Sequence, residues 1–119
     1  MNDYRVVFHV DEKERMPVAV GNIMNLVKDT ESGKPEIELV INGTAIAVFG
    51  DDAVLQQLTA IHNLGAKIVA CRNSIRMFCN NNPECPAAED KLPSFVKVVR
   101  AGVTEIIKRQ HEGYAYIKQ

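Results

Sequence analysis

Segments typical of strands alternate with segments typical of helices along this chain, and this order limits the folds that it can adopt. Five short segments rich in β-branched and aromatic residues are predicted to be strands: residues 4–10, 36–41, 67–71, 95–99 and 114–118. Apolar residues at helical spacing predict helices from 17, from 51 or 52, near 74–78 and from 103. The alternation indicates βαβ units and a mainly parallel sheet with helices on both faces.

The chain of 119 residues fits one domain, residues 1–119. With 46% apolar and 24% charged residues, its composition is that of a soluble globular protein, and a core of this size needs no disulfide for stability. We therefore predict a three-layer α/β/α domain of flavodoxin-like type with a mainly parallel five-stranded sheet. The run 44–49 fits either a short strand or a helical turn packed on the sheet, and we favour the turn.

Charge and motif content argue against several functional classes. The net charge of −1 gives no reason to expect direct nucleic-acid binding. No glycine-rich phosphate loop follows the first strand, so no cofactor is predicted. The spacing of Cys71, Cys79 and Cys85 matches no zinc motif, so no metal site is predicted. A membrane span of about eighteen apolar residues is absent, as is a secretory signal in residues 1–5, and we expect a cytoplasmic protein.

Cys71 is the strongest functional lead. It lies where the apolar run 67–70 gives way to a polar run that begins a short predicted helix. Ligands of parallel sheets bind beyond the carboxyl ends of the strands, which places Cys71 at the expected functional edge. Free N–H groups at a helix amino terminus favour an anion, so a thiol there tends toward the nucleophilic thiolate. The alternative is a small buried residue that only completes the strand.

Five further residues are candidates for binding or positioning at this edge. Arg72 and Arg76 can face one side of the short helix and stabilise a thiolate or an anionic sulfur acceptor; the alternative is a solvated surface charge. Asn73 and Ser74 are predicted helix caps that set where the thiol points. His9 ends the first strand and is predicted to reach the same edge, either paired with the thiol or as a satisfied structural histidine.

The other two cysteines have a less defined role. Three cysteines are an odd set, and in a reducing compartment we expect Cys79 and Cys85 to be free thiols rather than a structural bridge. A second hypothesis has Cys79 or Cys85 resolve a modified Cys71 by forming a disulfide with it. Otherwise Cys79 is a buried thiol at a helix end, and Cys85 is an incidental loop thiol.

Several blocks of sequence, in their order and spacing, point to one protein family. They are Leu-Gly-Ala-Lys-Ile-Val-Ala-Cys-Arg-Asn-Ser-Ile-Arg at 64–76, Gln-His-Glu-Gly-Tyr-Ala-Tyr-Ile at 110–117, and residues 4–10, 22–26 and 37–43. With these blocks the chain resembles the DsrE/DsrF-like family over nearly its whole length. Cys79, Cys85 and residues 80–86 fall outside the shared pattern.

The resemblance implies a flavodoxin-like α/β/α fold and a homo-oligomer, commonly a trimer or hexamer. It also implies a role in intracellular sulfur oxidation or in the sulfur relay that modifies tRNA. In such relays a cysteine carries sulfur as a persulfide between proteins, and the matching position is Cys71. Many relatives are small stand-alone proteins without an established function, and the chain resembles these most.

These observations lead to two main hypotheses. In the first, the chain is a sulfur carrier or sulfurtransferase that holds a persulfide on Cys71 and meets a sulfur donor or acceptor protein. In the second, it is a non-catalytic oligomeric module that binds a small ligand or a protein, and Cys71 is structural. A thiol redox switch is a third alternative. The apolar residues of 44–49 and 114–117 are expected to supply the oligomer interface.

Overall fold

Five parallel strands form one sheet in the order β4-β3-β2-β1-β5. The computed structural model describes residues 4–119, apart from the side chain of Thr30. Met1–Asp3 belong to the predicted domain and to the segment in which no secretory signal was predicted, and they lie outside the described residues. The strands are β1 (Arg5–Val10), β2 (Glu36–Ile41), β3 (Lys67–Cys71), β4 (Val96–Val99) and β5 (Ala115–Lys118). All four neighbouring pairs are parallel, which confirms the predicted parallel five-stranded sheet.

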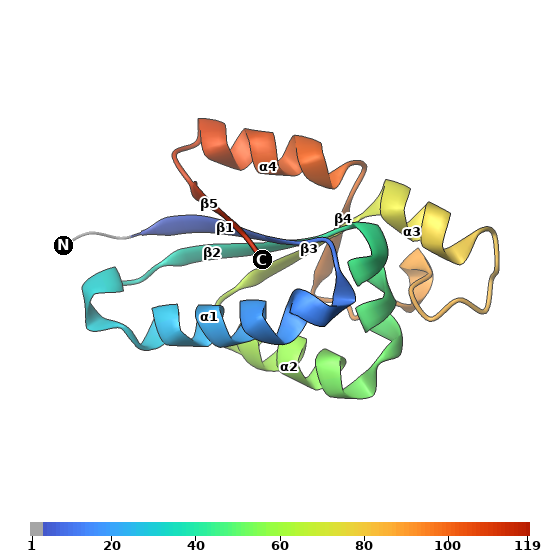
Figure 1. Cartoon of the computed structure of the whole chain (residues 1–119), viewed down its shortest axis with the longest axis horizontal. Helices are drawn as coiled ribbons and strands as arrows, with labels where there is room; N and C mark the ends of the chain where they lie inside the picture. Colours follow the sequence, from blue (N-terminus) through green and yellow to red (C-terminus); the bar gives the residue numbers. More distant parts are fainter. Residues whose placement is uncertain (1–3) are drawn as a thin grey trace.

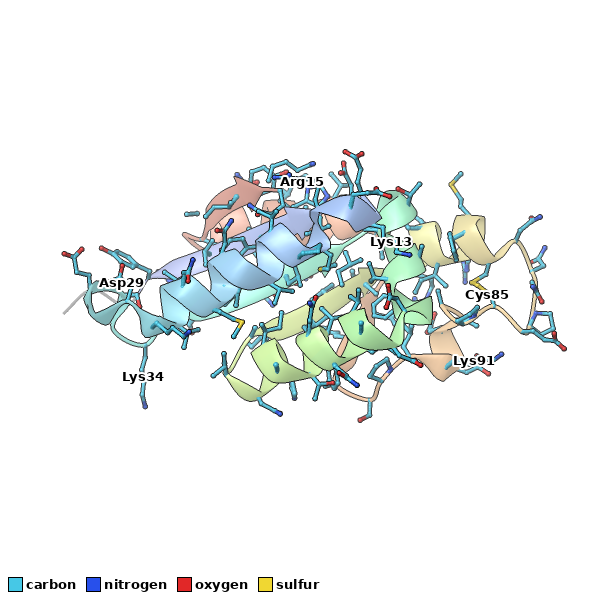
Figure 2. All side chains as sticks on the ribbon, turned by 60° about the horizontal axis from the view of Figure 1, so that its bottom comes forward. Lys13, Arg15, Asp29, Lys34, Cys85 and Lys91 are labelled. Atoms are coloured by element: carbon cyan, nitrogen blue, oxygen red, sulfur yellow. A yellow bond between two sulfur atoms is a disulfide. The ribbon has the colours of Figure 1, made fainter. Side chains whose placement is uncertain are left out.

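Helices cover both faces of the sheet, as predicted (Figure 1). The helices α1 (Met16–Lys28) and α2 (Asp52–Asn63) lie side by side on one face, and α4 (Gly102–His111) lies on the other (Figures 1 and 2). The short α3 (Arg72–Cys79) projects from the carboxyl end of β3. Short 3-10 helices lie in the connections: η1 (Lys13–Arg15), η2 (Thr30–Ser32), η3 (Gly43–Gly50) and η4 (Glu89–Lys91). None of the helices among residues 4–119 combines the length and the apolar character that crossing a membrane requires.

The order of the strands explains which face each helix covers. From β1 to β4 the chain steps each time to the next strand in the same direction, and then returns through α4 to place β5 beside β1. Crossovers between parallel strands are almost always right-handed. Steps in one direction therefore place α1 and α2 on one face, and the return step places α4 on the opposite face.

The two faces of the sheet bury different amounts of apolar surface. Alternate side chains of the central strands point to α1 and α2, where they join a large core that includes Phe8, Leu39 and Ile68. The intervening side chains point to α4 and form a small cluster: Val7, Val40, Val69 and Ile106. The layer formed by α4 thus rests on much less apolar contact than the opposite layer.

The run 44–49 forms part of the 3-10 helix η3, which confirms the preferred prediction of a helical turn. Its apolar side chains are buried in the core of the chain itself: Ala45, Ile46, Val48 and Phe49. The expectation that this run supplies an oligomer interface is therefore wrong. The turn folds back under α2, and Asp51 ends it and caps α2 by accepting hydrogen bonds from the next free N–H groups.

A buried group of charged side chains attaches α4 to β2. Glu38 of β2 is 1% exposed and Glu105 of α4 is 5% exposed. The Arg109 Nε atom lies 2.8 Å from Glu38 Oε2 and 3.1 Å from Glu105 Oε2, and its Nη1 lies 2.8 Å from Glu112 Oε1. The cluster links the sheet to two turns of α4, on the face where apolar contact is scarce.

The pKa values of the two buried carboxyl groups are shifted in opposite directions. Burial and the hydrogen bond to Glu105 raise the pKa of Glu38 to about 7. Burial opposes ionisation of Glu105, but the hydrogen bond from Glu38 and the charge of Arg109 hold the pKa of Glu105 below its ordinary value. Glu38 Oε1 is buried and has no hydrogen-bond partner in the structure, so a proton on this atom, directed to Glu105, would satisfy it.

This arrangement predicts a fall in stability as the pH rises. Because the folded-state pKa of Glu38 is raised, its contribution is complete below the ordinary value of 4.5 and is lost as the pH rises through about 7. We expect the free energy of unfolding to fall by roughly 1–3 kcal/mol between about pH 5 and about pH 8. Urea unfolding at several pH values measures it.

Glu38→Gln keeps a donor for Glu105 and cannot ionise, so its stability should fall less over the same pH range. The matched control is Glu36→Gln, an exposed carboxylate of the same strand, which should keep the pH dependence of the wild type. If the free energy of unfolding changes with pH in the same way for the wild type and Glu38→Gln, Glu38 does not titrate between about pH 5 and about pH 8.

Candidate functional site

Cys71 ends β3 and is the N-cap residue of α3. Its Sγ atom accepts a hydrogen bond from the Ser74 N–H at 3.5 Å, so the sulfur occupies the place that a hydroxyl or carboxylate usually takes at a helix start. The helix therefore begins at Arg72, and the prediction that Asn73 or Ser74 caps it is wrong. The side chain of Cys71 is only 5% exposed, and it is a free cysteine.

A second helix amino terminus meets the same sulfur. Gly102, the first residue of α4, packs against Cys71, and its backbone N–H helps to lower the pKa of the thiol. A Cβ atom at position 102 would lie 3.3 Å from Cys71 Cβ and 3.2 Å from Val40 Cγ1, so only glycine lets α4 approach this closely without displacing a neighbour. The sulfur thus lies beneath the positive ends of two helices.

These contacts favour the thiolate form of Cys71. Burial alone would raise the pKa of the thiol, but hydrogen bonds outweigh it and bring the pKa below the ordinary value. The donors are the Ser74 hydroxyl and the backbone N–H groups of Gly102, Ser74 and Asn73. A thiol that is both buried and acidic is shielded from bulk solvent and is still a nucleophile.

Ser74 connects the thiol to the turn after β2. Its hydroxyl accepts a hydrogen bond from the Gly43 N–H at 2.8 Å, which leaves the hydroxyl proton for the sulfur. Gly43 has a φ of +59°, and a Cβ there would lie 2.9 Å from the Asp11 carbonyl oxygen. A side chain at position 43 would therefore disturb the peptide that orients Ser74.

His9 lies at the same edge of the sheet and bridges two other residues. Its Nε2 lies 2.8 Å from Asn42 Oδ1, and its Nδ1 lies 2.7 Å from the Tyr116 hydroxyl. An amide oxygen only accepts, so Nε2 carries the proton and Nδ1 accepts from Tyr116. His9 thus holds Asn42, the residue before Gly43, rather than contacting the sulfur through a hydrogen bond.

The two candidate arginines face η4. Arg72 forms a two-pronged ion pair with Glu89, with N···O distances of 2.8 and 3.0 Å. Arg76 is exposed, and its charge helps to lower the pKa of Glu89 after the contribution of Arg72. The structure therefore pairs Arg72 with this carboxylate, leaves Arg76 exposed on the same helix, and lowers the pKa of the thiol through backbone N–H groups and Ser74.

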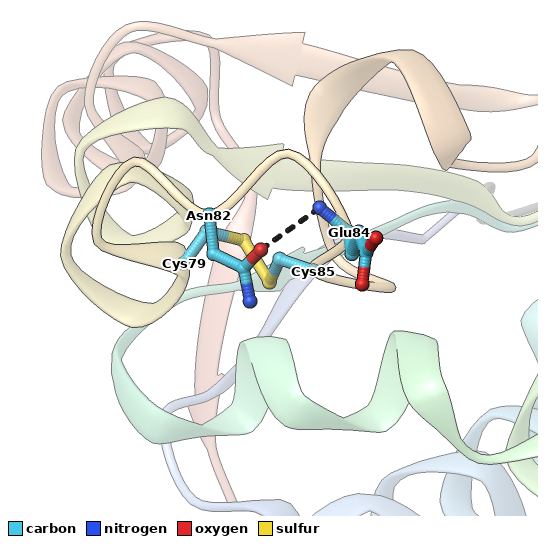
Figure 3. The surroundings of a disulfide bond; sticks show 4 residues. All are labelled: Cys79, Asn82, Glu84 and Cys85. Atoms are coloured by element: carbon cyan, nitrogen blue, oxygen red, sulfur yellow. Dashed lines mark hydrogen bonds between the residues drawn. A yellow bond between two sulfur atoms is a disulfide. The ribbon is translucent and has the colours of Figure 1, made fainter.

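Cys79 and Cys85 form a disulfide with each other (Figure 3). The expectation that both are free thiols is wrong, and a disulfide between either of them and Cys71 is not formed. Asn80 and Asn81 have φ values of 48° and 62°, and this pair of left-handed residues reverses the chain after α3. The reversal brings the two Cα atoms to 5.4 Å, the usual separation for a disulfide.

An apolar hollow of about 290 Å³ opens beside Ser74. It is lined by Gly43, Thr44, Ser74, Met77 and Phe78. Met77 is 84% exposed and Phe78 is 45% exposed, which is unusual for large apolar side chains. Ser74 lines this hollow and its backbone N–H donates to the Cys71 sulfur, so the hollow lies one residue contact away from the buried thiol.

Sequence reasoning missed Gly102 and Tyr116, whereas the Asn42-Gly43-Thr44 loop is one that the strand order predicts to reach this edge of the sheet. The Asn42-Gly43 pair is a recognisable turn signal, but nothing local shows that its N–H meets Ser74. Residues 4–119 contain no group of three or more His, Cys, Asp or Glu side chains placed to hold a metal ion.

Comparisons with known proteins agree with this fold. The model of the DsrE/DsrF-like family matches residues 6–119. A solved protein of unknown function from Methanobacterium thermoautotrophicum is 32% identical, with a TM-score of 0.82, over 98% of this chain and 100% of that one. Another, from Bacteroides thetaiotaomicron, shares the fold at 14% identity, with a TM-score of 0.68, over 97% of this chain and 94% of that one. Functionally curated proteins give no match.

Replacing Ser74 tests the hydrogen bonding of the thiol. We expect Ser74→Ala to raise the pKa of Cys71 and to slow its alkylation near neutral pH about three- to tenfold, because one hydrogen bond is worth about 0.5–1.5 kcal/mol. The pH dependence of alkylation by iodoacetamide measures this, since Cys71 is the only free thiol of the described chain. Ser94→Ala, at an exposed loop position, should match the wild type. An unchanged profile in Ser74→Ala would contradict the assigned hydrogen bond.

Proposed function

The chain belongs to the DsrE/DsrF-like family, and we propose that it is a sulfur carrier or sulfur-transfer protein that holds a persulfide on Cys71. One observation supports this more than any other. The Cys71 sulfur accepts a hydrogen bond from the first turn of α3, the first turn of α4 packs against the residue, and its pKa is lowered although it is buried. Such a site favours a sulfur anion and keeps water away from it.

The proposed step is a simple displacement. The Cys71 thiolate attacks the outer sulfur of a donor persulfide or polysulfide, and a new S–S bond forms at Sγ. The S–S bond of the donor breaks, and its electron pair leaves on the donor thiolate. Transfer to an acceptor thiolate reverses these roles, so no oxidant, cofactor or metal is consumed.

The same hydrogen-bond donors would serve Cys71 both as a thiolate and as a persulfide. A persulfide carries its negative charge one atom further out than a thiolate does. The Ser74 hydroxyl borders the apolar hollow, so a persulfide that extends toward the hollow keeps a hydrogen-bond donor at its base. Exposed Met77 and Phe78 beside the opening suit an apolar contact with a donor or acceptor protein. Whether the chain turns over as a sulfurtransferase or carries one sulfur per encounter depends on that partner.

A binding module without sulfur chemistry is the second candidate function. The exposed apolar side chains around the hollow favour it, because they would serve a ligand or partner even if Cys71 were only a packing residue. Titration of the thiol separates the two functions. A Cys71 pKa at or above the free value of about 8.5 favours the module, and a lower one favours the carrier.

We also propose that the chain forms a homo-oligomer, a trimer or hexamer as in its family, and acts in the cytoplasm. The support lies on α4 and β5 rather than on η3. Val103 and Ile107 of α4 and Tyr116 and Ile117 of β5 are between 39% and 61% exposed. β5 is also an edge strand of the sheet, and exposed apolar edges are usually covered.

Incubation with inorganic polysulfide tests the carrier function. We expect intact mass to show a gain of one sulfur atom that a reductant removes, because the Cys71 thiolate accepts the outer sulfur of the donor. Cys71→Ser should show no gain. The Cys79→Ser/Cys85→Ser double variant is the matched control and should still take up the sulfur after long incubation. An adduct of equal size in Cys71→Ser, or none in the wild type, would rule out a persulfide on Cys71.

The oligomer is tested by light scattering. We expect a mass above that of the monomer at micromolar concentration, and we expect Ile107→Glu to reduce it, because a charge at an apolar interface is costly to bury. Leu64→Glu changes an equally exposed apolar side chain at the end of α2 and should leave the mass unchanged. A wild-type monomer would refute the proposal.

A further inference from the structure

The disulfide Cys79–Cys85 and the thiol of Cys71 lie at opposite ends of one short helix. Cys71 is the N-cap of α3, and Cys79 is its last residue. The disulfide closes the turn that follows α3, and it ties the helix to a segment whose Cys85 and Ala87 are buried in the large core. Any change at this disulfide therefore acts on the helix whose first turn holds the Cys71 sulfur.

The two cysteines of the disulfide differ in their surroundings, because Cys79 lines a hollow and Cys85 is buried. A hollow of about 300 Å³ lies between α3 and the segment after it, and Cys79 forms part of its lining, together with Arg76, Asn82 and Glu89. Cys85 does not line this hollow and is only 6% exposed. An incoming thiolate thus meets Cys79. The exposed guanidinium of Arg76 lines the same hollow and can attract this thiolate, because Glu89, the nearby carboxylate, is already paired with Arg72.

We propose that Cys79–Cys85 is a thiol–disulfide exchange site for a dithiol reductant, and that its redox state sets the reactivity of Cys71 through α3. The first half stands on the disulfide, its hollow and the cytoplasmic location proposed above. The second half rests on the function proposed for Cys71. A cytoplasmic disulfide is usually exchangeable, because the thiol pools of that compartment keep structural bridges reduced.

The exchange balances in two steps. A thiolate of the reductant attacks Cys79 Sγ, a mixed disulfide forms, and the electron pair of the broken bond moves to Cys85, which takes up a proton. The second thiolate of the reductant then attacks its own bonded sulfur and releases Cys79. The reductant leaves as a disulfide, and two electrons have passed to the cysteine pair.

The geometry selects a dithiol over a monothiol. After the first step Cys85 stays close to the mixed disulfide, because the two Cα atoms are 5.4 Å apart and Cys85 is packed in the core. Its thiol can attack Cys79 again and expel a monothiol. A dithiol escapes this reversal, because its second thiol completes the reaction within the same molecule.

Loss of the bridge reaches Cys71 through the helix. An α-helix of eight residues is marginal without tertiary support. Its first turn supplies the Ser74 and Asn73 donors to the Cys71 sulfur, and the bridge anchors its last turn. Ile75 remains buried and Arg72 remains paired with Glu89 after reduction, so the helix loosens rather than unfolds. Reduction should therefore lower the reactivity of Cys71 without removing it.

The exchange site is tested by counting free thiols under native conditions. After mild oxidation with oxidised glutathione we expect one free thiol, and peptide mapping should find Cys79 bonded to Cys85. Dithiothreitol should then give three free thiols, whereas reduced glutathione at the same thiol concentration should leave mostly one. Three free thiols after the oxidation step, or equal reduction by the two reagents, overturns the exchange site.

The coupling is tested on Cys71 itself. We expect the Cys79→Ser/Cys85→Ser variant to alkylate at Cys71 about three- to tenfold more slowly near neutral pH than the oxidised wild type. The same comparison on wild type before and after dithiothreitol, read on the Cys71 peptide by mass spectrometry, does not depend on how the variant folds. Identical rates in both comparisons overturn the coupling. A persulfide that fails to form on Cys71 would refute the carrier function and leave these rates as they are, so the two failures are distinguishable.

Discussion

The absence of a side chain at position 102 lets the first turn of α4 lie against Cys71, and the electrostatics of the site depend on this contact. The contact has a counterpart further along the same helix. Arg109 and Glu105 join Glu38 of β2, so α4 is fixed at Gly102 by close packing and by charge through Glu105 in its first turn and Arg109 in its last turn. Buried charges are costly to desolvate, and we interpret these three as groups that fix the orientation of α4. They keep Gly102 against Cys71, although α4 itself has little apolar contact with the sheet.

The rest of the site follows from the parallel sheet. Because β1, β2 and β3 all end at one edge, the residues that follow them meet there, although they are far apart in the sequence. His9 holds Asn42, and the next peptide presents the Gly43 N–H to Ser74. The groups that lower the pKa of the thiol therefore come from the connections after β3 and β4, the connection after β2 orients Ser74, and none of these groups is a charged side chain. This differs from an arginine-based site, because backbone donors lose no side-chain entropy when they bind an anion.

Much of this could be predicted from the sequence, because the relevant signals are local. Runs of β-branched and aromatic residues predicted the strands, and apolar residues at helical spacing predicted the helices. The change from strand to helix then placed Cys71 at the edge of the sheet. The start of α3 was misplaced because a cysteine is not among the usual N-cap residues. The contacts of Gly102 and Gly43 join residues about thirty positions apart, and no local pattern encodes them. The disulfide was not predicted, because the expectation of free thiols was based on a reducing compartment and not on the chain reversal at Asn80 and Asn81. The buried Glu38 did have a signal, since it is the one charge within the apolar strand run 37–41.

The thin apolar layer beneath α4 has a consequence for the motion of the site. Elements with little buried apolar contact open first in local fluctuations of a native protein, so detachment of α4 is the least costly way to uncover the sulfur from that side. The same opening withdraws the Gly102 N–H and restores water around the thiol. Opening on this side thus has two opposed effects on the acidity of Cys71: it removes one group that lowers the pKa of the thiol, and it relieves the burial that raises it. An encounter that proceeds through the hollow beside Ser74 avoids both effects, because α4 stays in place while the partner arrives.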